Sequence, residues 1–329
     1  MRLVALSLCA LVGLSAPAVA NTLIVGNKFE GTVSFIDLES GTEVLRPQTG
    51  GSPHEVALSP DGKTAVVVSY LEDGYIGEEL NLFDVATATR SDTVTISPHL
   101  APHGIAWIGT TDSVIVTTEE TRDVIRVDVG QAKVTGAATT DQIGSHLLAL
   151  SPDSKTAYVT SRGSDTLSVI DVETMDLKTT LAAGEGPEAV DVSPDGKSLW
   201  VGNNRSKDIY VFDTDTMKRS ARIDVGFLPI RVRFHPDGAH VAVADLRQDR
   251  IVVYDAKSHA QVADIDLSKA GAETPASLLF APDGSSLFVG AQSSGNVVEI
   301  DAGTWEITRV LGAGDGADGL AFSYIKMKP

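Results

Sequence analysis

Short runs of apolar residues alternate with turn residues along almost the whole chain. The clearest marker is a four-residue, largely apolar run that closes on aspartate: SFID, NLFD, IRVD, SVID, YVFD, VVYD and VEID. These runs end at Asp37, Asp84, Asp128, Asp171, Asp213, Asp255 and Asp301, at spacings of 47, 44, 43, 42, 42 and 46 residues. Seven copies at such a period predict a β-propeller, in which each blade is a small sheet that buries its faces against its neighbours.

The unit from Glu185 to Gly226 contains the four strands expected of one blade, at 188–192, 198–202, 208–212 and 220–224. Between the first two, Ser193-Pro194-Asp195-Gly196 predicts a type I turn, because Pro presets φ at its second position and Gly relieves its fourth. We therefore predict an all-β fold, a seven-bladed β-propeller with four-stranded antiparallel blades. The repeated aspartate is expected to accept hydrogen bonds from backbone amides of the following turn, and we assign it no chemistry.

The two ends of the chain complement each other. The N-terminal segments TLIVGN, TVSFID and TEVLRPQ supply three strands of a blade but no innermost strand, and the C-terminal GADGLAFS resembles an innermost strand with no blade after it. We expect both ends to complete one blade, which closes the ring and removes open sheet edges. A single propeller domain is expected over 21–329.

Residues 1–20 have the pattern of a cleaved secretory signal: Arg2, an apolar run, and Ala18-Val19-Ala20 before Asn21. We expect export to the periplasm or medium, with cleavage near Ala20. The only cysteine, Cys9, lies in this segment. The mature chain would therefore hold neither a disulfide nor a thiolate metal site.

Charge narrows the choice of partners. Without Arg2 the chain has 25 basic and 44 acidic residues, a balance of −19. Such a chain repels phosphate backbones, so no nucleic acid is expected as a partner. No window after the signal is apolar enough to span a bilayer, so we expect a protein that is not embedded in a membrane, and a monomer.

The segment TAYVTSRGSDTLSVIDVETMDLKTTLAAG, Thr156 to Gly184, resembles the YVTN-type β-propeller repeat, in the superfamily of nitrite-reductase-like and lactonase-like propellers. The tetrapeptide is partly kept, as YVTS at 158–161 and WVGN at 200–203. The resemblance covers essentially the whole mature chain and implies the propeller fold. It leaves the function open, because similar propellers serve as binding scaffolds, lactonases, lyases and haem or copper enzymes.

Candidate site residues follow from propeller geometry, which places the start of every innermost strand at one mouth of the central channel. Each of these strands starts with a repeated Pro, which is replaced by Ser145 in the third and by Ala317 in the last. The residues that follow this position are, in order, His54, His103, His146, Glu188, Ile230, Ala276 and Asp318. Each of three successive blades therefore has a histidine at this position. With Glu188 or Asp318 beside them, these imidazoles are candidate ligands for a divalent metal; alternatively they only initiate strands.

Loops on the same face add further candidates for ligand binding. Arg162, Arg205 and Arg247, with Arg231 at a strand start, could bind a carboxylate or phosphate, or they pair with nearby acids in solvent. Acidic residues gather on the second and third blades, at Glu72, Asp73, Glu119 and Glu120. The insertion from Tyr70 to Leu80 is expected to overhang His54 as a lid or partner contact.

Two functions remain open from the sequence. The favoured one is an exported propeller that binds a small ligand or a periplasmic protein at the channel mouth and is not an enzyme. The alternative is a metal-dependent lactonase or lyase, or a redox accessory protein, that uses the histidines at the mouth. No Gly-rich phosphate loop, HExxH, nucleophile elbow or haem-attachment pair occurs in the sequence, which favours the first.

Overall fold

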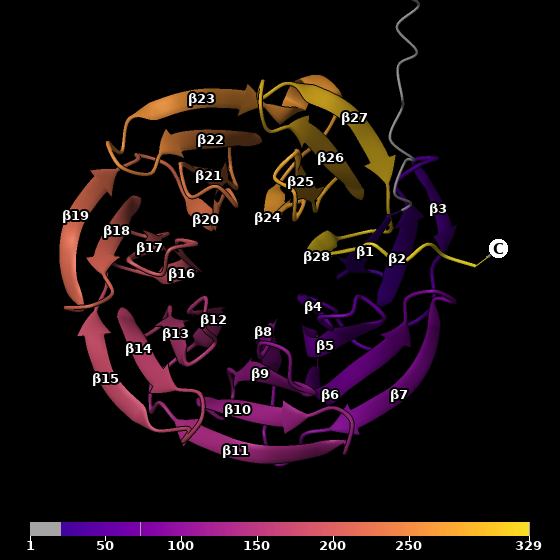
Figure 1. Ribbon diagram of the computed structural model, residues 1–329, viewed down its shortest axis with the longest axis horizontal. Coiled ribbons are helices and arrows are strands. Elements are labelled where there is room, and N and C mark those ends of the chain that lie inside the picture. The colour runs from indigo at the N-terminus through magenta and orange to yellow at the C-terminus, as the bar shows by residue number, and fades with distance from the viewer. Residues whose placement is uncertain (1–20, 73, 329) are drawn as a thin grey trace, which may run out of the picture.

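Seven four-stranded antiparallel sheets are arranged as blades around a central opening (Figure 1). The computed structural model describes residues 21–72 and 74–328. Seven strands surround the opening: β4 (Val56–Leu58), β8 (Pro102–Trp107), β12 (Ser145–Leu150), β16 (Pro187–Val192), β20 (Pro229–Phe234), β24 (Pro275–Phe280) and β28 (Ala317–Ser323). The predicted seven-bladed propeller is confirmed.

The other three strands of each blade follow in order outwards. The second strands are β1 (Thr22–Asn27), β5 (Thr64–Glu72), β9 (Ser113–Thr118), β13 (Thr156–Ser161), β17 (Ser198–Asn203), β21 (His240–Asp245) and β25 (Ser286–Ala291). The third are β2 (Thr32–Asp37), β6 (Tyr75–Asp84), β10 (Asp123–Asp128), β14 (Thr166–Asp171), β18 (Asp208–Asp213), β22 (Arg250–Asp255) and β26 (Asn296–Asp301). The outermost are β3 (Thr42–Leu45), β7 (Thr89–Thr95), β11 (Lys133–Thr139), β15 (Leu177–Ala182), β19 (Lys218–Asp224), β23 (Gln261–Asp266) and β27 (Ile307–Gly312).

The middle strands hold the hydrophobic core, which lies between neighbouring blades. In β14 the side chains of residues 167–170 are all buried, whereas β15 at the outer edge of the same blade is mostly exposed. Each core cluster combines residues of adjacent blades, as where Trp200 of β17 packs edge-on against Phe234 of β20 at 5.8 Å between ring centroids. Blades are therefore stable only as part of the ring, because their faces are buried only against each other.

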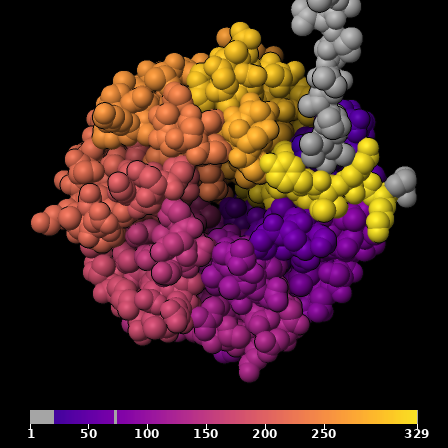
Figure 2. Space-filling model, viewed as in Figure 1, coloured from indigo at the N-terminus to yellow at the C-terminus, as the bar shows by residue number. Residues whose placement is uncertain are grey.

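The ring closes as the sequence predicts. Strand β28 pairs antiparallel with β1, with Leu23 opposite Phe322 and Ile24 opposite Ala321. Figure 2 shows the C-terminal strand region (yellow) against the N-terminal blade (indigo), beside the hollow at the centre of the face. The segment 1–20, expected to be a signal peptide, lies outside the described residues. Within the described chain, no helix is long and apolar enough to cross a membrane.

The repeated aspartate has the structural role expected of it. In all seven blades its Oδ1 atom accepts a hydrogen bond from the backbone amide three residues later, at 2.7–2.9 Å. The Ser193–Gly196 turn also forms: the Gly196 amide donates to the Ser193 carbonyl at 2.8 Å, with φ of 74° at Gly196. Aspartate and turn together fix the lengths of the hairpins and so the register of each blade.

Innermost strands share an irregularity that the sequence did not reveal. In six blades the pairing register shifts by one residue directly after the first residue of the innermost strand, so that one extra residue bulges from the strand. His103, His146, Glu188 and Asp318 all lie in these shifts. A bulge re-aims the side chain it carries. Here it presents the candidate residues at the channel mouth.

Candidate functional site

Three imidazoles from three successive blades lie against one another at the mouth of the channel. The ring centroids of His103 and His146 are 3.7 Å apart with an interplanar angle of 33°, and those of His54 and His103 are 4.8 Å apart. Their exposed fractions are 5%, 2% and 3% for His54, His103 and His146. The structure thus brings the three predicted residues together.

Tyr70 covers this row of rings. Tyr70 lies on β5, the second strand of the blade in which the insertion extends the β5–β6 hairpin. Its ring packs edge-on against the rings of His54 and His103, at centroid distances of 4.5 Å and 4.6 Å. The insertion thus reaches His54, as expected, through Tyr70. The tyrosine removes the imidazoles from solvent and limits access to them.

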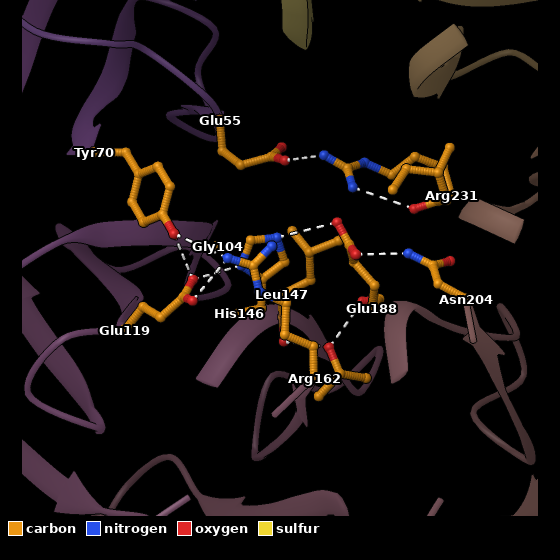
Figure 3. A network of polar contacts seen from close by, with 12 residues as sticks. Glu55, Tyr70, Gly104, Glu119, His146, Leu147, Arg162, Glu188, Asn204 and Arg231 are labelled. Carbon is orange, nitrogen blue, oxygen red and sulfur yellow. Dashed lines mark hydrogen bonds and ion pairs between the residues drawn. The ribbon is translucent and has the colours of Figure 1, made fainter. Parts of the chain in front are cut away.

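His146 is held between two carboxylates (Figure 3). Its Nδ1 atom lies 2.7 Å from Oε2 of Glu119, on the preceding blade, and its Nε2 atom lies 3.2 Å from Oε1 of Glu188, on the following blade. Burial lowers the pKa of His146, but these two carboxylates outweigh burial and raise it above its usual value. The imidazolium form therefore links three blades.

Glu119 connects this ion pair to the rim. Its carboxylate also accepts hydrogen bonds from Tyr70 Oη at 2.7 Å and from Arg162 Nη2 at 2.8 Å. Burial raises the pKa of Glu119, but the hydrogen bond and charge of His146 and the charge of Arg162 outweigh it and lower the pKa to about 2. Glu119 is therefore a permanent carboxylate, saturated by its partners.

Glu188 has a similar environment. Besides His146, it accepts a hydrogen bond from Asn204 Nδ2 at 2.6 Å (Figure 3). Burial raises the pKa of Glu188, but the hydrogen bond and charge of His146 and the charge of Arg231 outweigh burial and lower this pKa to about 2. Both carboxylates beside His146 are thus ionised throughout the neutral range.

The other two histidines are neutral. Burial lowers the pKa of both His54 and His103 well below the usual value, and the charges around them lower it further. His54 Nδ1 lies 3.2 Å from the carbonyl oxygen of Ser52, which fixes the proton on Nδ1. His103 Nδ1 is buried and has no hydrogen-bond partner among the described residues.

On the other side of the mouth, Arg231 contacts two acids, the half-buried Glu55 and the buried Asp318. Its Nη2 atom donates to Glu55 Oε1 at 2.7 Å and lies 3.7 Å from Oδ1 of Asp318. Burial raises the pKa of Asp318 to about 7, although Arg231 opposes this. Gln292 Nε2 donates to Asp318 Oδ2 at 3.2 Å, while Oδ1 is left without a hydrogen bond from the described chain.

A cavity of about 210 Å³ continues from the mouth along the innermost strands. Glu55 and Arg231 belong to its lining, and Asp191 and Arg233 contribute the charged side chains further along. Both pairs join a half-buried acid to an arginine, at 2.7 Å and 3.4 Å. The cavity therefore has two charged pairs in its lining.

The arginines expected at the mouth divide into two groups. Arg162 and Arg231 belong to the network described above, whereas Arg205 and Arg247 are exposed on the rim. Arg205 pairs with Asp165 there. Glu55 and Asn204 were missed from the sequence: Glu55 simply follows His54 in the chain, and no motif marks Asn204.

The three histidines do not form a ready metal site. Both ring nitrogens of His146 are bound to carboxylates, and its ring lies over that of His103 instead of pointing with it to a common position. Across the described residues, no group of three or more His, Cys, Asp or Glu side chains is arranged to hold a metal ion. A shared ion would require the Glu119 or Glu188 contact of His146 to break.

Comparison with known families agrees with this architecture. The model of the family described as "Lactonase, 7-bladed beta-propeller" matches residues 26–222 and 229–312. The chain belongs to this family. The match supports the propeller expected from the repeats; the finer YVTN-type assignment remains an expectation.

This lactonase-family propeller also resembles solved structures of low sequence identity. One is titled "Kuenenia stuttgartiensis Hydrazine Synthase", with a TM-score of 0.74 and 18% identity, covering 85% of this chain and 92% of the other. At that identity the likeness concerns the fold alone. No curated protein matches this chain.

Proposed function

We propose that this chain is an exported propeller that binds a small polar ligand, or a polar group of a protein partner, at the channel mouth and catalyses no reaction of its own. One observation carries the proposal: in a densely paired buried network, His103 Nδ1 and Asp318 Oδ1 lack hydrogen bonds. A buried polar atom without a partner costs about 1–3 kcal/mol. A ligand that bonds to these atoms recovers that free energy.

The pairing of the other groups supports binding over catalysis. A general base needs a free proton acceptor. Glu119 and Glu188 are both occupied by His146 and further donors, and their pKa values of about 2 make them weak bases. His103 is the imidazole with a free Nδ1, and its lowered pKa makes it a weak base as well.

The binding proposal is tested by native mass spectrometry of protein purified from the periplasm. We expect a bound small molecule in the wild type and in Arg247→Ala, the matched control at the exposed rim, and its loss from His103→Ala. Retention by a folded His103→Ala variant would overturn binding at the mouth. Export is tested separately by fusing residues 1–20 to alkaline phosphatase, which is active only after translocation; an inactive fusion would contradict export.

Lactone hydrolysis is the second candidate, favoured by the family match. In that reaction His103 would accept a proton from water, and the water oxygen would add to the lactone carbonyl. The ring C–O bond would then break as the leaving ring oxygen takes this proton back from His103, which gives a hydroxy acid and restores the neutral imidazole. Binding and lactone hydrolysis are distinguished by measuring acid release from γ-butyrolactone and glucono-δ-lactone in a pH-stat. Turnover that is lost in His103→Ala and kept in Arg247→Ala would replace the binding proposal.

A further inference from the structure

Three polar groups at the mouth are only partly used by the network around them. Asp318 accepts a hydrogen bond from Gln292 at Oδ2, whereas its Oδ1 atom lies 3.7 Å from Arg231 and accepts no hydrogen bond from a described residue. The His103 Nδ1 atom has no hydrogen-bond partner among these residues, and the ammonium of Lys28 lies over the Phe29 ring at 5.6 Å without an ion pair to a described residue. Asp318 and His103 are 3% and 2% exposed. Both are thus built into the mouth and cannot turn away to bulk water.

Lys28 lies close to this group in space. It belongs to the loop between β1 and β2, and its backbone amide donates to the Gly316 carbonyl at the entry to β28, the strand of Asp318. Its charge lowers the pKa of both His54 and Asp318. Lys28 and Asp318 therefore lie at the same blade junction, and among the described residues they form no ion pair with each other.

The remaining charges at the mouth compensate one another. Arg231 donates to Glu55 and lies at the longer distance of 3.7 Å from Asp318, and the imidazolium of His146 together with Arg162 faces Glu119 and Glu188. Apart from Asp318, these groups are three cations and three carboxylates. What remains for a ligand is the Oδ1 atom of Asp318, the ammonium of Lys28 and the neutral imidazole nitrogen of His103.

We propose that the mouth binds a small zwitterion, with its ammonium at Asp318 and its carboxylate at Lys28 and the His103 ring. This inference rests on the proposed binding function and names its ligand class. A ligand with a single charge would leave either Lys28 or Asp318 unmatched in a poorly solvated site, which is costly. A zwitterion adds no net charge and supplies both a donor and an acceptor.

Calorimetric titration tests the ligand class with a series of increasing length: glycine, β-alanine and 4-aminobutyrate. Methylammonium and acetate are the probes with one charge each. We expect at least one zwitterion to bind and neither single-charge probe to match it. Asp318→Asn and Lys28→Gln should each weaken binding by at least about tenfold, equivalent to about 1.4 kcal/mol. Asp315→Asn, an exposed acid three residues from Asp318, should bind like the wild type.

Each outcome distinguishes this inference from the function on which it rests. Binding of acetate or methylammonium as tight as that of the zwitterions, or zwitterion affinity unchanged in Asp318→Asn and Lys28→Gln, overturns the ligand class but leaves a binding site. The same holds if no probe binds although native mass spectrometry detects another bound molecule. If no probe binds and no bound molecule is detected, both proposals fail. Thermal melts confirm folding, and Lys28→Gln, at a partly exposed position, serves as the second variant.

Discussion

The Nδ1 atom of His146 lies 2.7 Å from Oε2 of Glu119, which reaches it from the neighbouring blade. This contact joins two consecutive units of the repeat inside the channel mouth, where solvent does not screen it. His146 contacts Glu188 on the next blade through its other nitrogen. The polar network therefore contributes to the alignment of blades as well as to the site.

Replacing Glu119 should destabilise the ring. Glu119→Ala leaves His146 and Arg162 as buried or half-buried cations without their shared carboxylate, and removal of one partner from a buried ion pair costs about 3–5 kcal/mol. The unfolding free energy from guanidinium denaturation measures the loss. Glu120→Ala, at the exposed neighbouring position, is the control and should change it by less than about 0.5 kcal/mol. Equal effects of the two variants would contradict the network.

The three histidines should titrate in opposite directions. Because His146 has a raised pKa, its ring should remain protonated above pH 6.5, whereas His54 and His103, with lowered pKa values, should remain neutral below it. NMR of the imidazole resonances against pH distinguishes these states. Three similar titrations near 6.5 would contradict the assigned environments.

The same pKa shifts predict how stability changes with pH. His146 contributes stability that is complete below pH 6.5 and is lost as pH rises through its folded-state pKa. His54 and His103 bind fewer protons folded than unfolded, so they make stability fall as pH drops below 6.5. His103→Gln should therefore reduce the slope of stability between pH 5 and 6 by up to about 1.4 kcal/mol per pH unit. An unchanged slope would count against a neutral buried His103.

Gly319 should not tolerate a side chain. A Cβ atom there would overlap with the carbonyl oxygen of His54, which lies just before the adjacent innermost strand β4. Gly319→Ala therefore forces β28 and the neighbouring blade apart, and we expect a loss of about 1–3 kcal/mol in thermal or chemical unfolding. Gly312→Ala is the matched control, because a Cβ atom there meets no atom within 4 Å. Similar stabilities for the two variants would show that the strands can separate without cost.

Removal of β28 should open the ring. Truncation after Gly316 exposes the hydrogen-bonding edge of β1, which then lies open to pairing between chains. Size-exclusion chromatography with light scattering should show larger assemblies or aggregates than the full-length chain forms. A monomeric truncated protein with an unchanged melting temperature would contradict the role assigned to this strand.

The sequence by itself determined the repeat and hence the architecture. Spacing of the seven aspartates specified seven blades, and the unmatched strands at the two ends specified closure by β28. It also placed His54, His103 and His146 at one mouth, because equivalent positions of a repeat occupy equivalent places around the ring. The blades depend on patterns that repeat within about one blade, and the closure follows because the two ends hold complementary parts of one such pattern.

Tertiary structure decided what these residues do. The bulges aim the side chains, and the partners come from distant segments: Glu119 is 27 residues from His146, and Glu55 is 176 residues from Arg231. No local pattern records such pairings. Whether a histidine is charged, neutral or free to bind a ligand depends on burial and on these pairings, which exist only after the ring has closed.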